Sequence, residues 1–412
     1  MDTLVIGGGV IGVCSAYYLA ERGQSVTLVE QADIAAGSSY GNAGLIVPSH
    51  SVPLAAPGAL SRGLKWLLDS ESPFYIKPRF DFKLFEWLLR FSLAAREGPM
   101  RRAIPALRDL GHLSLALYDA LAALDGFEFG YQRKGLLAIY RTRSRLAAGV
   151  EEAHRLNEYG ITAQALDAAQ VRQMEPNVRE GVVGGVYYPG DTHLRPADFV
   201  RGLAGLAEKK GVHICRGTEV LGFEVSGRKV AAVKTTRGDF HPVQVVLAAG
   251  AWSPVVARDL RLKVPIQAAK GYSITIRRPE QSPTIPLLLG EARVIATPMG
   301  DVLRFAGTLE LAGLDFSINR RRVAAIERAA REYMPGLERL EPLEIWRGLR
   351  PCTPDGLPMI GRAREFDNLI FAAGHAMLGM SLGPATGKLV TQVASGEKPD
   401  VDLRPFRPER FN

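Results

Sequence analysis

The sequence predicts an α/β protein in which a doubly wound layer of parallel strands and helices is interleaved with an α+β part that carries a mixed, mainly antiparallel sheet. Two observations predict the first layer: an apolar strand, a glycine-rich turn and a helix follow one another in residues 3–20, and the same order returns in residues 368–390. The second part is predicted by strand signals, broken by proline and glycine, throughout residues 264–315. A chain of 412 residues suits two interwoven domains.

The N-terminal segment has the order and spacing of a dinucleotide-binding unit. Gly7, Gly9 and Gly12 follow the first strand, and Glu30 ends the second strand eighteen residues after Gly12. The three glycines permit a sharp turn, the approach of a pyrophosphate and close packing of the helix on the strand. The N–H groups at the helix start attract phosphate, and an acid at position 30 binds ribose hydroxyls, so FAD or NAD is expected rather than NADP. The alternative, glycines that only turn the chain, leaves Glu30 unexplained.

Residues 35–50 are small and rich in hydroxyl groups. They are too polar for a core and too poor in charge for a solvated loop, so we expect this backbone to lie along the ligand. His50, at its end, is a candidate catalytic residue that faces the substrate; a structural hydrogen-bonding role is the alternative.

Residues 60–123 are predicted to be helical, with apolar residues at helical spacing around Trp66 and from Leu84 to Phe91. This face either packs on the body of the protein or docks on a bilayer or partner. A further helix is expected over Ile104–Leu124.

The middle of the chain alternates short helices with strands. Gly160, Pro176 and Gly211 are read as helix stops. The pattern predicts a strand at 136–140, helices at 144–159, 167–174, 198–210 and 320–333, a loop at 184–196, and a β-meander at 212–215, 218–223, 229–235 and 240–248.

Composition and charge exclude several classes of partner and site. Lys and Arg exceed Asp and Glu by 51 to 43, but no long basic run occurs, so nucleic acid is not expected as a partner, while anionic substrates or lipid head groups fit a net charge of +8. The three cysteines have neither metal nor disulfide spacing, which predicts no metal site and a reducing compartment. No apolar stretch reaches the ~18 residues of a membrane span, and the first strand leaves no room for a signal peptide. We expect a cytoplasmic protein, and attachment to the inner face of the membrane stays open.

The last hundred residues carry a second set of glycine motifs. Gly-Leu-Arg-Pro stands at 348–351, and a glycine-rich turn after the final strand begins another helix, whose N-terminus could face a flavin ring. Together with Gly7–Glu30 and Val245–Ser253, the run Gly348–Gly387 resembles the D-amino-acid oxidase superfamily of FAD-dependent amine oxidoreductases.

Within that superfamily, Gly37–Gly44, Ser72–Pro78 and Gly374–Gly387 look most like the D-amino-acid dehydrogenase small-subunit group, which includes enzymes acting on D-proline and hydroxy-D-proline. The resemblance implies a Rossmann-like FAD domain of the glutathione reductase type and a substrate domain. The first would comprise residues 1–60, 142–260 and 340–412, and the second residues 61–141 and 261–339. Non-covalent FAD is expected, because Cys352 lies in an Arg-Pro-x-Thr-Pro-Asp turn that differs from the pattern of covalent relatives.

The resemblance also implies residue roles. Arg350 matches the clamp for the substrate carboxylate, which its planar fork suits; a structural salt bridge is the alternative. Tyr272 matches a tyrosine that relatives place over that carboxylate, although a core tyrosine fits the sequence as well. Met377 stands where glycine-oxidising relatives carry an arginine, which implies an apolar wall.

The expected cofactor contacts are turn glycines, small or hydroxyl-bearing residues, helix starts and one acid. They are Gly7, Gly9, Val10, Ile11, Gly12, Glu30, Gln31, Ser38, Ser39, Asn42, Ala43, Gly44, Leu45, Val220, Ala249, Gly250, Trp252, Gly374, Leu378, Gly379, Met380 and Ser381.

The resemblance implies oxidative deamination of a D-amino acid by hydride transfer from Cα to flavin N5, with electrons passed to a quinone or another non-oxygen acceptor. An oxygen-using amine or glycine oxidase is one alternative. A non-redox FAD-binding or tRNA-modification module is another, and such a module would not need Arg350 beside the flavin. The amino acid preferred and the oligomeric state do not follow from the sequence.

Overall fold

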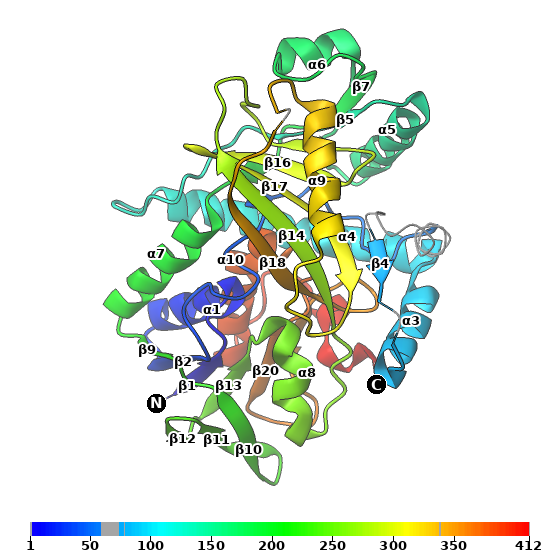
Figure 1. Cartoon of the computed structure of the whole chain (residues 1–412). Helices are drawn as coiled ribbons and strands as arrows, with labels where there is room; N and C mark the ends of the chain where they lie inside the picture. The colour runs from blue at the N-terminus through cyan, green and yellow to red at the C-terminus, as the bar shows by residue number, and fades with distance from the viewer. Residues whose placement is uncertain (1, 59–73, 78, 338, 412) are drawn as a thin grey trace.

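The computed structural model describes residues 2–58, 74–77, 79–337 and 339–411 (Figure 1). Its first main layer is a six-stranded sheet in the order β19-β20-β13-β1-β2-β9, in which only the β19–β20 pair is antiparallel. These strands are β1 (Thr3–Ile6), β2 (Val26–Glu30), β9 (His213–Arg216), β13 (Gln244–Leu247), β19 (Met359–Arg362) and β20 (Leu369–Ala373). Both glycine-rich segments of the sequence therefore enter the same sheet.

Helices cover one face of the six-stranded sheet and a β-meander covers the other. Val5, Leu28 and Val246 pack on the helical side, whereas Leu4 and Val245 pack on the meander side, as expected for strands buried on both faces. The helices are α1 (Val10–Glu21), α7 (Pro196–Lys209) and α10 (Gly379–Ala394), and the meander consists of β10 (Val220–Ser226), β11 (Lys229–Thr235) and β12 (Gly238–Phe240).

The second main layer is a mixed, mainly antiparallel sheet in the order β18-β14-β17-β16-β15-β5-β7-β6, with β4 paired to β17. Helix α9 (Arg320–Tyr333) packs on one face of this sheet, through Ile326 against Ile274 and Phe305 (Figure 1). The strands are β4 (Phe74–Ile76), β5 (Leu136–Tyr140), β6 (Gln164–Asp167), β7 (Gly184–Tyr188), β14 (Gln267–Arg277), β15 (Leu287–Leu289), β16 (Val294–Met299), β17 (Val302–Leu311) and β18 (Pro342–Cys352).

The remaining elements connect or flank the two layers. They are β3 (Leu45–Ile46) paired with β8 (Thr192–His193), helices α3 (Phe82–Ala94), α4 (Glu97–Ala122), α5 (Arg143–Glu158), α6 (Ala168–Met174) and α8 (Ser253–Val256), and the 3-10 turns η1 (Gly250–Trp252), η2 (Ala257–Leu260), η3 (Arg404–Phe406) and η4 (Pro408–Phe411). No helix in the described ranges is both long and apolar enough to span a bilayer.

The predicted loop at 184–196 is wrong in part, because it contains β7 and β8. Two consecutive glycines hid the strand signal. A Cβ on Gly185 would lie 2.6 Å from the Ala138 carbonyl oxygen, and one on Gly184 would lie 2.7 Å from that of Leu166, so flanking strands approach too closely for side chains.

Sheet membership also departs from the predicted domain ranges. Strands β6, β7 and β18 belong to the nine-stranded sheet, although residues 142–260 and 340–412 were assigned to the FAD domain. Helix α4 begins at Glu97, earlier than predicted, and continues through Pro105. The predicted helix around Trp66 lies outside the described residues, as do Ser72, Pro73 and Pro78 of the Ser72–Pro78 segment.

Candidate functional site

A cavity of about 1550 Å³ lies between the two main sheets. Its wall includes residues at the carboxyl ends of β1 and β2, the starts of α1 and α10, and parts of β14, β17 and β18. Carboxyl edges of parallel strands are the usual ligand sites of doubly wound sheets, and this volume exceeds the ~300–1,000 Å³ of ordinary small-molecule pockets. The cavity therefore has room for a dinucleotide together with a small substrate.

The glycine turn before α1 is forced by close packing. Gly7 has φ +114°, and a Cβ there would lie 2.6 Å from the Ala248 carbonyl oxygen. A Cβ on Gly12 would lie 1.8 Å from the Gly7 carbonyl oxygen, so Gly12 is needed for packing of the helix on the strand. Gly12 itself is absent from the cavity wall, whereas Gly7 and Gly9 border it.

The N-terminus of α1 is open toward an anion. The backbone N–H of Val10 donates to Ser39 Oγ at 3.0 Å, but the N-cap residue, Gly9, has no side chain to cap the helix and the first turn holds no acid. The N–H groups of Ile11 and Gly12 come too early in the helix to have intrahelical acceptors. With the helix dipole, they offer hydrogen bonds and partial positive charge to phosphate oxygens.

Glu30 ends β2 beside this turn and borders the cavity. Its Oε2 accepts a hydrogen bond from the Gly8 N–H at 2.7 Å and its Oε1 accepts one from the Ala32 N–H at 2.9 Å. These contacts orient the carboxylate, and each oxygen keeps a further lone pair for a hydroxyl group. Gln31 and Val220 border the cavity in the same region.

The start of α10 opens on the same cavity. Leu378 is its N-cap without a side-chain hydrogen bond, the first turn is free of acids, and Gly379 and Met380 border the cavity. A Cβ on Gly387 would lie 2.5 Å from the backbone carbon of Cys14, so α10 and α1 pack backbone against backbone. Two uncapped helix starts are thereby held side by side.

Residues 38–45 cross from one layer to the other. Ser38 Oγ donates to the Leu349 carbonyl at 2.5 Å, and the buried Arg304 donates to the carbonyls of Tyr40 at 3.1 Å and Asn42 at 3.0 Å. Other predicted contacts that border the cavity are Ser39, Ala43, Leu45, Ala249, Gly250 and Trp252. Besides Gly12, three predicted contacts are absent from its wall: Gly44, Gly374 and Ser381.

Those three residues have structural roles instead. Gly44 and Gly374 have φ of +73° and +83°, conformations that favour glycine. A Cβ on Gly44 would lie 2.3 Å from the Leu194 carbonyl oxygen. Ser381 Oγ accepts from the Val47 N–H at 2.9 Å, so it fastens the start of α10 to the crossing segment.

Arg350 borders the cavity with its guanidinium. It stands opposite Ala269 in the β14–β18 register, and a Cβ on Gly271 would lie 2.0 Å from its Nη1, so the guanidinium lies across the space that a side chain at 271 would need. Nη1 donates to the Thr308 carbonyl at 2.7 Å. Within the described part of the chain Arg350 has no carboxylate partner, and burial lowers its pKa. A half-buried cation at a cavity wall without a counterion among the described residues is a site for an anionic ligand.

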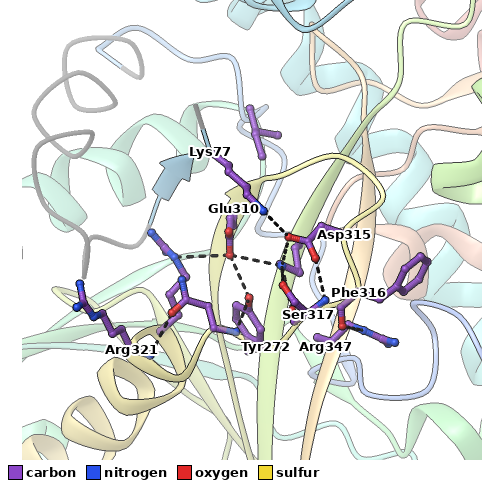
Figure 2. Close-up of polar contacts among 12 residues, drawn as sticks. Lys77, Tyr272, Glu310, Asp315, Phe316, Ser317, Arg321 and Arg347 are labelled. Atoms are coloured by element: carbon purple, nitrogen blue, oxygen red, sulfur yellow. Dashed lines mark hydrogen bonds and ion pairs between the residues drawn. The ribbon is translucent and has the colours of Figure 1, made fainter. Parts of the chain in front are cut away.

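Tyr272 does not join Arg350. Side chains alternate along a strand, so Tyr272 points with Ile274 toward α9, on the face opposite Gly271. Its hydroxyl donates to Glu310 Oε2 at 3.0 Å and accepts from the Asn319 N–H at 3.2 Å (Figure 2). Although Tyr272 borders the cavity, its hydroxyl is already committed, and the predicted contact with a carboxylate held by Arg350 is not supported.

The hydroxyl of Tyr272 instead joins a buried ionic cluster (Figure 2). Glu310 lies 3.9 Å from Lys270 Nζ and 3.8 Å from Arg322 Nε, and Lys270 also approaches Asp315 at 3.2 Å. Asp315 belongs to the loop that carries Phe316, whose ring stacks on Trp252 at the cavity wall. The cluster thus fixes the loop beside the cavity.

His50 and Met377 both border the cavity. Nδ1 of His50 lies 3.1 Å from Ser49 Oγ, and burial together with nearby Arg293 lowers the pKa of His50 to about 4, so its imidazole is neutral at physiological pH. Met377 is 46 % exposed and offers an apolar surface.

Several residues of the site escaped the sequence reading. Gly271 was visible only as the neighbour of Tyr272, and its role follows from the position of the Arg350 side chain. Thr308, whose carbonyl holds Arg350, has φ +62°, a conformation that no sequence pattern marks. Asp191, a buried carboxylate hydrogen-bonded to Ser49, lies in the segment read as a loop.

A family model for FAD dependent oxidoreductases (DAO) matches residues 2–393. The chain belongs to this family. The D-amino acid dehydrogenase of Methylobacterium radiotolerans is 34 % identical to it over 408 residues, 97 % of each chain. The protein of that name from Methylobacterium nodulans is 33 % identical over 408 residues, again 97 % of each.

Solved structures show the same fold. Glycine oxidase from Geobacillus kaustophilus superimposes with a TM-score of 0.81 at 24 % identity and covers 99 % of this chain and 98 % of its own. L-proline dehydrogenase from P. horikoshii superimposes with a TM-score of 0.80 at 20 % identity. It covers 100 % of this chain and 97 % of its own.

The cofactor of this FAD-dependent oxidoreductase fits the cavity. The volume suffices, two uncapped helix starts border it, and an oriented carboxylate stands at the end of β2. Among the described residues no group of three His, Cys, Asp or Glu side chains could hold a metal ion.

Proposed function

We propose that the protein oxidises D-amino acids, with Arg350 as the clamp for the substrate carboxylate. The observation that carries the proposal is the half-buried guanidinium of Arg350, which faces the cavity without a carboxylate partner in the described residues. Bound FAD supplies the acceptor for the hydride that leaves Cα. The amine lone pair then forms the C=N bond, and the imino acid is hydrolysed to a 2-oxo acid and ammonia, or remains a cyclic imine if the substrate is proline-like.

The chain's own residues bind and orient the substrate and the cofactor. The carbonyl of Thr308 fixes one side of the Arg350 fork and Gly271 leaves the space that the fork occupies. We assign the pyrophosphate to the N–H groups at the starts of α1 and α10, and the ribose hydroxyls to Glu30. Such orientation supplies much of the rate in a reaction whose chemistry belongs to the cofactor.

The test is anaerobic mixing of the purified yellow protein with matched D- and L-amino acids while the flavin absorbance is followed. We expect D-forms to bleach the flavin faster. D-proline and hydroxy-D-proline are proposed as preferred substrates, which the sequence resemblance and the apolar Met377 support. Faster bleaching by L-forms or by glycine would contradict the proposal.

We further propose that electrons leave to a quinone at a membrane surface. Helix α3 supports this, because Phe82 and Phe85 on its outer face are 93 % and 69 % exposed, whereas Trp87 and Phe91 on its inner face border the cavity. An amphipathic helix with exposed aromatic side chains and nearby basic groups suits an anionic bilayer.

Two measurements address the acceptor. Turnover with a quinone analogue should greatly exceed peroxide production in air, and Phe82→Ser with Phe85→Ser should reduce flotation with anionic vesicles without changing dye-coupled turnover. The alternative is an oxygen-using oxidase, favoured by the likeness to glycine oxidase from Bacillus cereus, which is 25 % identical with a TM-score of 0.78. Peroxide production equal to the quinone rate would decide for the oxidase.

A further inference from the structure

We propose that Asp191, Ser49 and His50 form a proton relay that removes the proton which the substrate's ammonium group must lose before its nitrogen can form the C=N bond. The inference rests on the proposed amino-acid oxidation. It gives His50 a defined step and adds two residues for which the proposed function has no use.

The relay is a chain of hydrogen bonds that leads from the cavity into the interior. Ser49 Oγ donates to Asp191 Oδ2 at 2.5 Å, and the backbone N–H of Ser49 donates to Asp191 Oδ1 at 3.1 Å. On its other side, Ser49 Oγ lies 3.1 Å from Nδ1 of His50. Ser49 and His50 border the same cavity as Arg350, whereas Asp191 lies behind them.

The donors can be assigned from the number of hydrogens. A serine hydroxyl has one hydrogen, and here it goes to Asp191. Ser49 Oγ must therefore accept from His50, which places the imidazole hydrogen on Nδ1. The second ring nitrogen, Nε2, is then an acceptor, and no hydrogen bond to it is formed by the residues that the structure describes.

Asp191 is built to receive a proton. Asp191 is 1 % exposed, and within the described ranges no cation pairs with its carboxylate. Burial raises the pKa of Asp191 to about 7, even though both hydrogen bonds from Ser49 act to lower it. Its backbone is fixed on both sides, since its N–H donates to the Tyr188 carbonyl and its carbonyl accepts from the Gly135 N–H at 2.9 Å.

His50 is suited to pass the proton on without retaining it. Burial and the charge of Arg293 hold the pKa of His50 at about 4, well below that of Asp191. Two phenols, Tyr187 and Tyr188, lie near Asp191. Burial raises the pKa of both, with the charge of Asp191 adding to the shift of Tyr187 and those of Glu152, Tyr140 and Asp191 adding to the shift of Tyr188. These phenols stay neutral, so Asp191 is the proton store of the group.

The step balances without any other reactant. The substrate ammonium gives a proton to Nε2 of His50, Nδ1–H passes to Ser49 Oγ, and the Ser49 hydroxyl hydrogen passes to Asp191 Oδ2. The ammonium becomes an amine and the carboxylate becomes an acid, while no bond to carbon changes. The lone pair that remains on nitrogen is the one that forms the C=N bond when hydride leaves Cα.

The pH dependence has a definite sign. Below a pH of about 7 Asp191 is already protonated and cannot accept, so the second-order rate of anaerobic flavin reduction by a D-amino acid should rise through this pH in the wild-type holoenzyme. Well above the pKa of the substrate ammonium the free amine binds directly, and the relay is no longer needed.

The test compares Asp191→Asn with wild type from pH 6 to pH 10. An asparagine oxygen still accepts from Ser49 but takes no proton. We expect flavin reduction to fall roughly 100-fold at pH 7.5, the low end of general acid–base effects, and to recover to within about threefold at pH 10. Ser49→Ala removes the hydroxyl that links His50 to Asp191, so it should show the same loss. The double variant should show no further loss.

Glu175→Gln is the matched control, because Glu175 is a fully buried carboxylate that accepts from Thr284 N–H at 2.7 Å and is absent from the cavity wall. It should keep the wild-type pH profile. A readout independent of turnover is infrared difference spectroscopy, in which the carboxylic acid band of Asp191 should appear when the pH falls below 7 and be missing from Asp191→Asn.

Three results would overturn the relay. One is an unchanged pH profile in Asp191→Asn, another is a loss of equal size at every pH, which indicates a structural role, and the third is additive losses in the double variant. If no D-amino acid reduces the wild-type flavin, the proposed function fails and the relay fails with it. Reduction by wild type with any of the three results removes the relay alone.

Discussion

At the scale of single residues, the site depends on groups that the fold leaves without partners. Arg350 is the clearest case, because its guanidinium lies against Gly271 and, among the described residues, hydrogen-bonds only to the Thr308 carbonyl. Tyr272 is the opposite case, since Glu310 and Asn319 already satisfy its hydroxyl. Neighbouring residues of the fold thus differ in whether they have hydrogen-bonding capacity left for a ligand.

Arg350→Ala should reduce kcat/KM by roughly 30- to 3000-fold while FAD stays bound. Truncating one partner of a buried, charge-assisted pair costs about 2–5 kcal/mol, because the other charge is left unpaired, and ~1.4 kcal/mol corresponds to tenfold. Arg350→Lys keeps the charge without the fork, so its loss should be intermediate. Steady-state kinetics and the flavin absorbance of the purified variants measure both. A folded, yellow Arg350→Ala protein within about threefold of wild type would exclude the clamp.

At the scale of secondary-structure elements, the sequence predicted strands and helices correctly wherever the local hydrophobic pattern agrees with the tertiary packing. The strand at 136–140 and the helix at 320–333 lie where the apolar periodicity placed them. The strand at Gly184–Tyr188 did not, because glycines required by close backbone contacts resemble turn residues in a sequence. The direction of the Tyr272 side chain could not be predicted from the sequence, because it depends on which face of β14 packs against α9 in the tertiary structure. The same holds for Asp191, whose partner Ser49 is 142 residues away in the chain.

Gly387→Ala should destabilise the protein and weaken FAD binding. The new methyl group would meet the Cys14 backbone at 2.5 Å, so α10 must move from α1, and overpacking of this kind costs about 1–3 kcal/mol. Gly205→Ala in α7 is the matched control, because no atom lies within 4 Å of its Cβ position and alanine favours a helix interior. Thermal unfolding and FAD titration of both variants measure the effect. Equal midpoints for the two variants would show that the α1–α10 contact tolerates a methyl group.

On the scale of the whole molecule, the cavity lies between two sheets that the chain enters repeatedly (Figure 1). The cofactor is therefore expected to hold the layers together. Because a ligand that binds only the folded state stabilises it by RT ln(1 + [L]/Kd), FAD at 100 times its Kd should add about 2.7 kcal/mol to the free energy of unfolding.

Removal of FAD should correspondingly lower the thermal midpoint, and re-addition should restore it. Glu30→Ala should lower FAD occupancy and show a smaller rise on re-addition, since the proposed ribose contacts would be lost. Asp33→Ala is the control, because Asp33 forms an exposed ion pair with Arg216 and is absent from the cavity wall. A Glu30→Ala protein that retains full FAD would show that Glu30 is not a ribose ligand.

The last strands and helix of the fold have a consequence for how the protein is made. β18 carries Arg350, and β19, β20 and α10 then complete the six-stranded sheet and the second helix start at the cavity. Synthesis runs from the N-terminus at about 5–20 residues per second, so β1 and α1 leave the ribosome long before β20 and α10. The nascent chain therefore carries an incomplete cofactor site through most of translation, with the β13 edge of the sheet unpaired and α1 not yet covered by α10. FAD loading belongs to the end of synthesis, and chains interrupted before residue 394 are expected to be released colourless and to become substrates for chaperones and proteases.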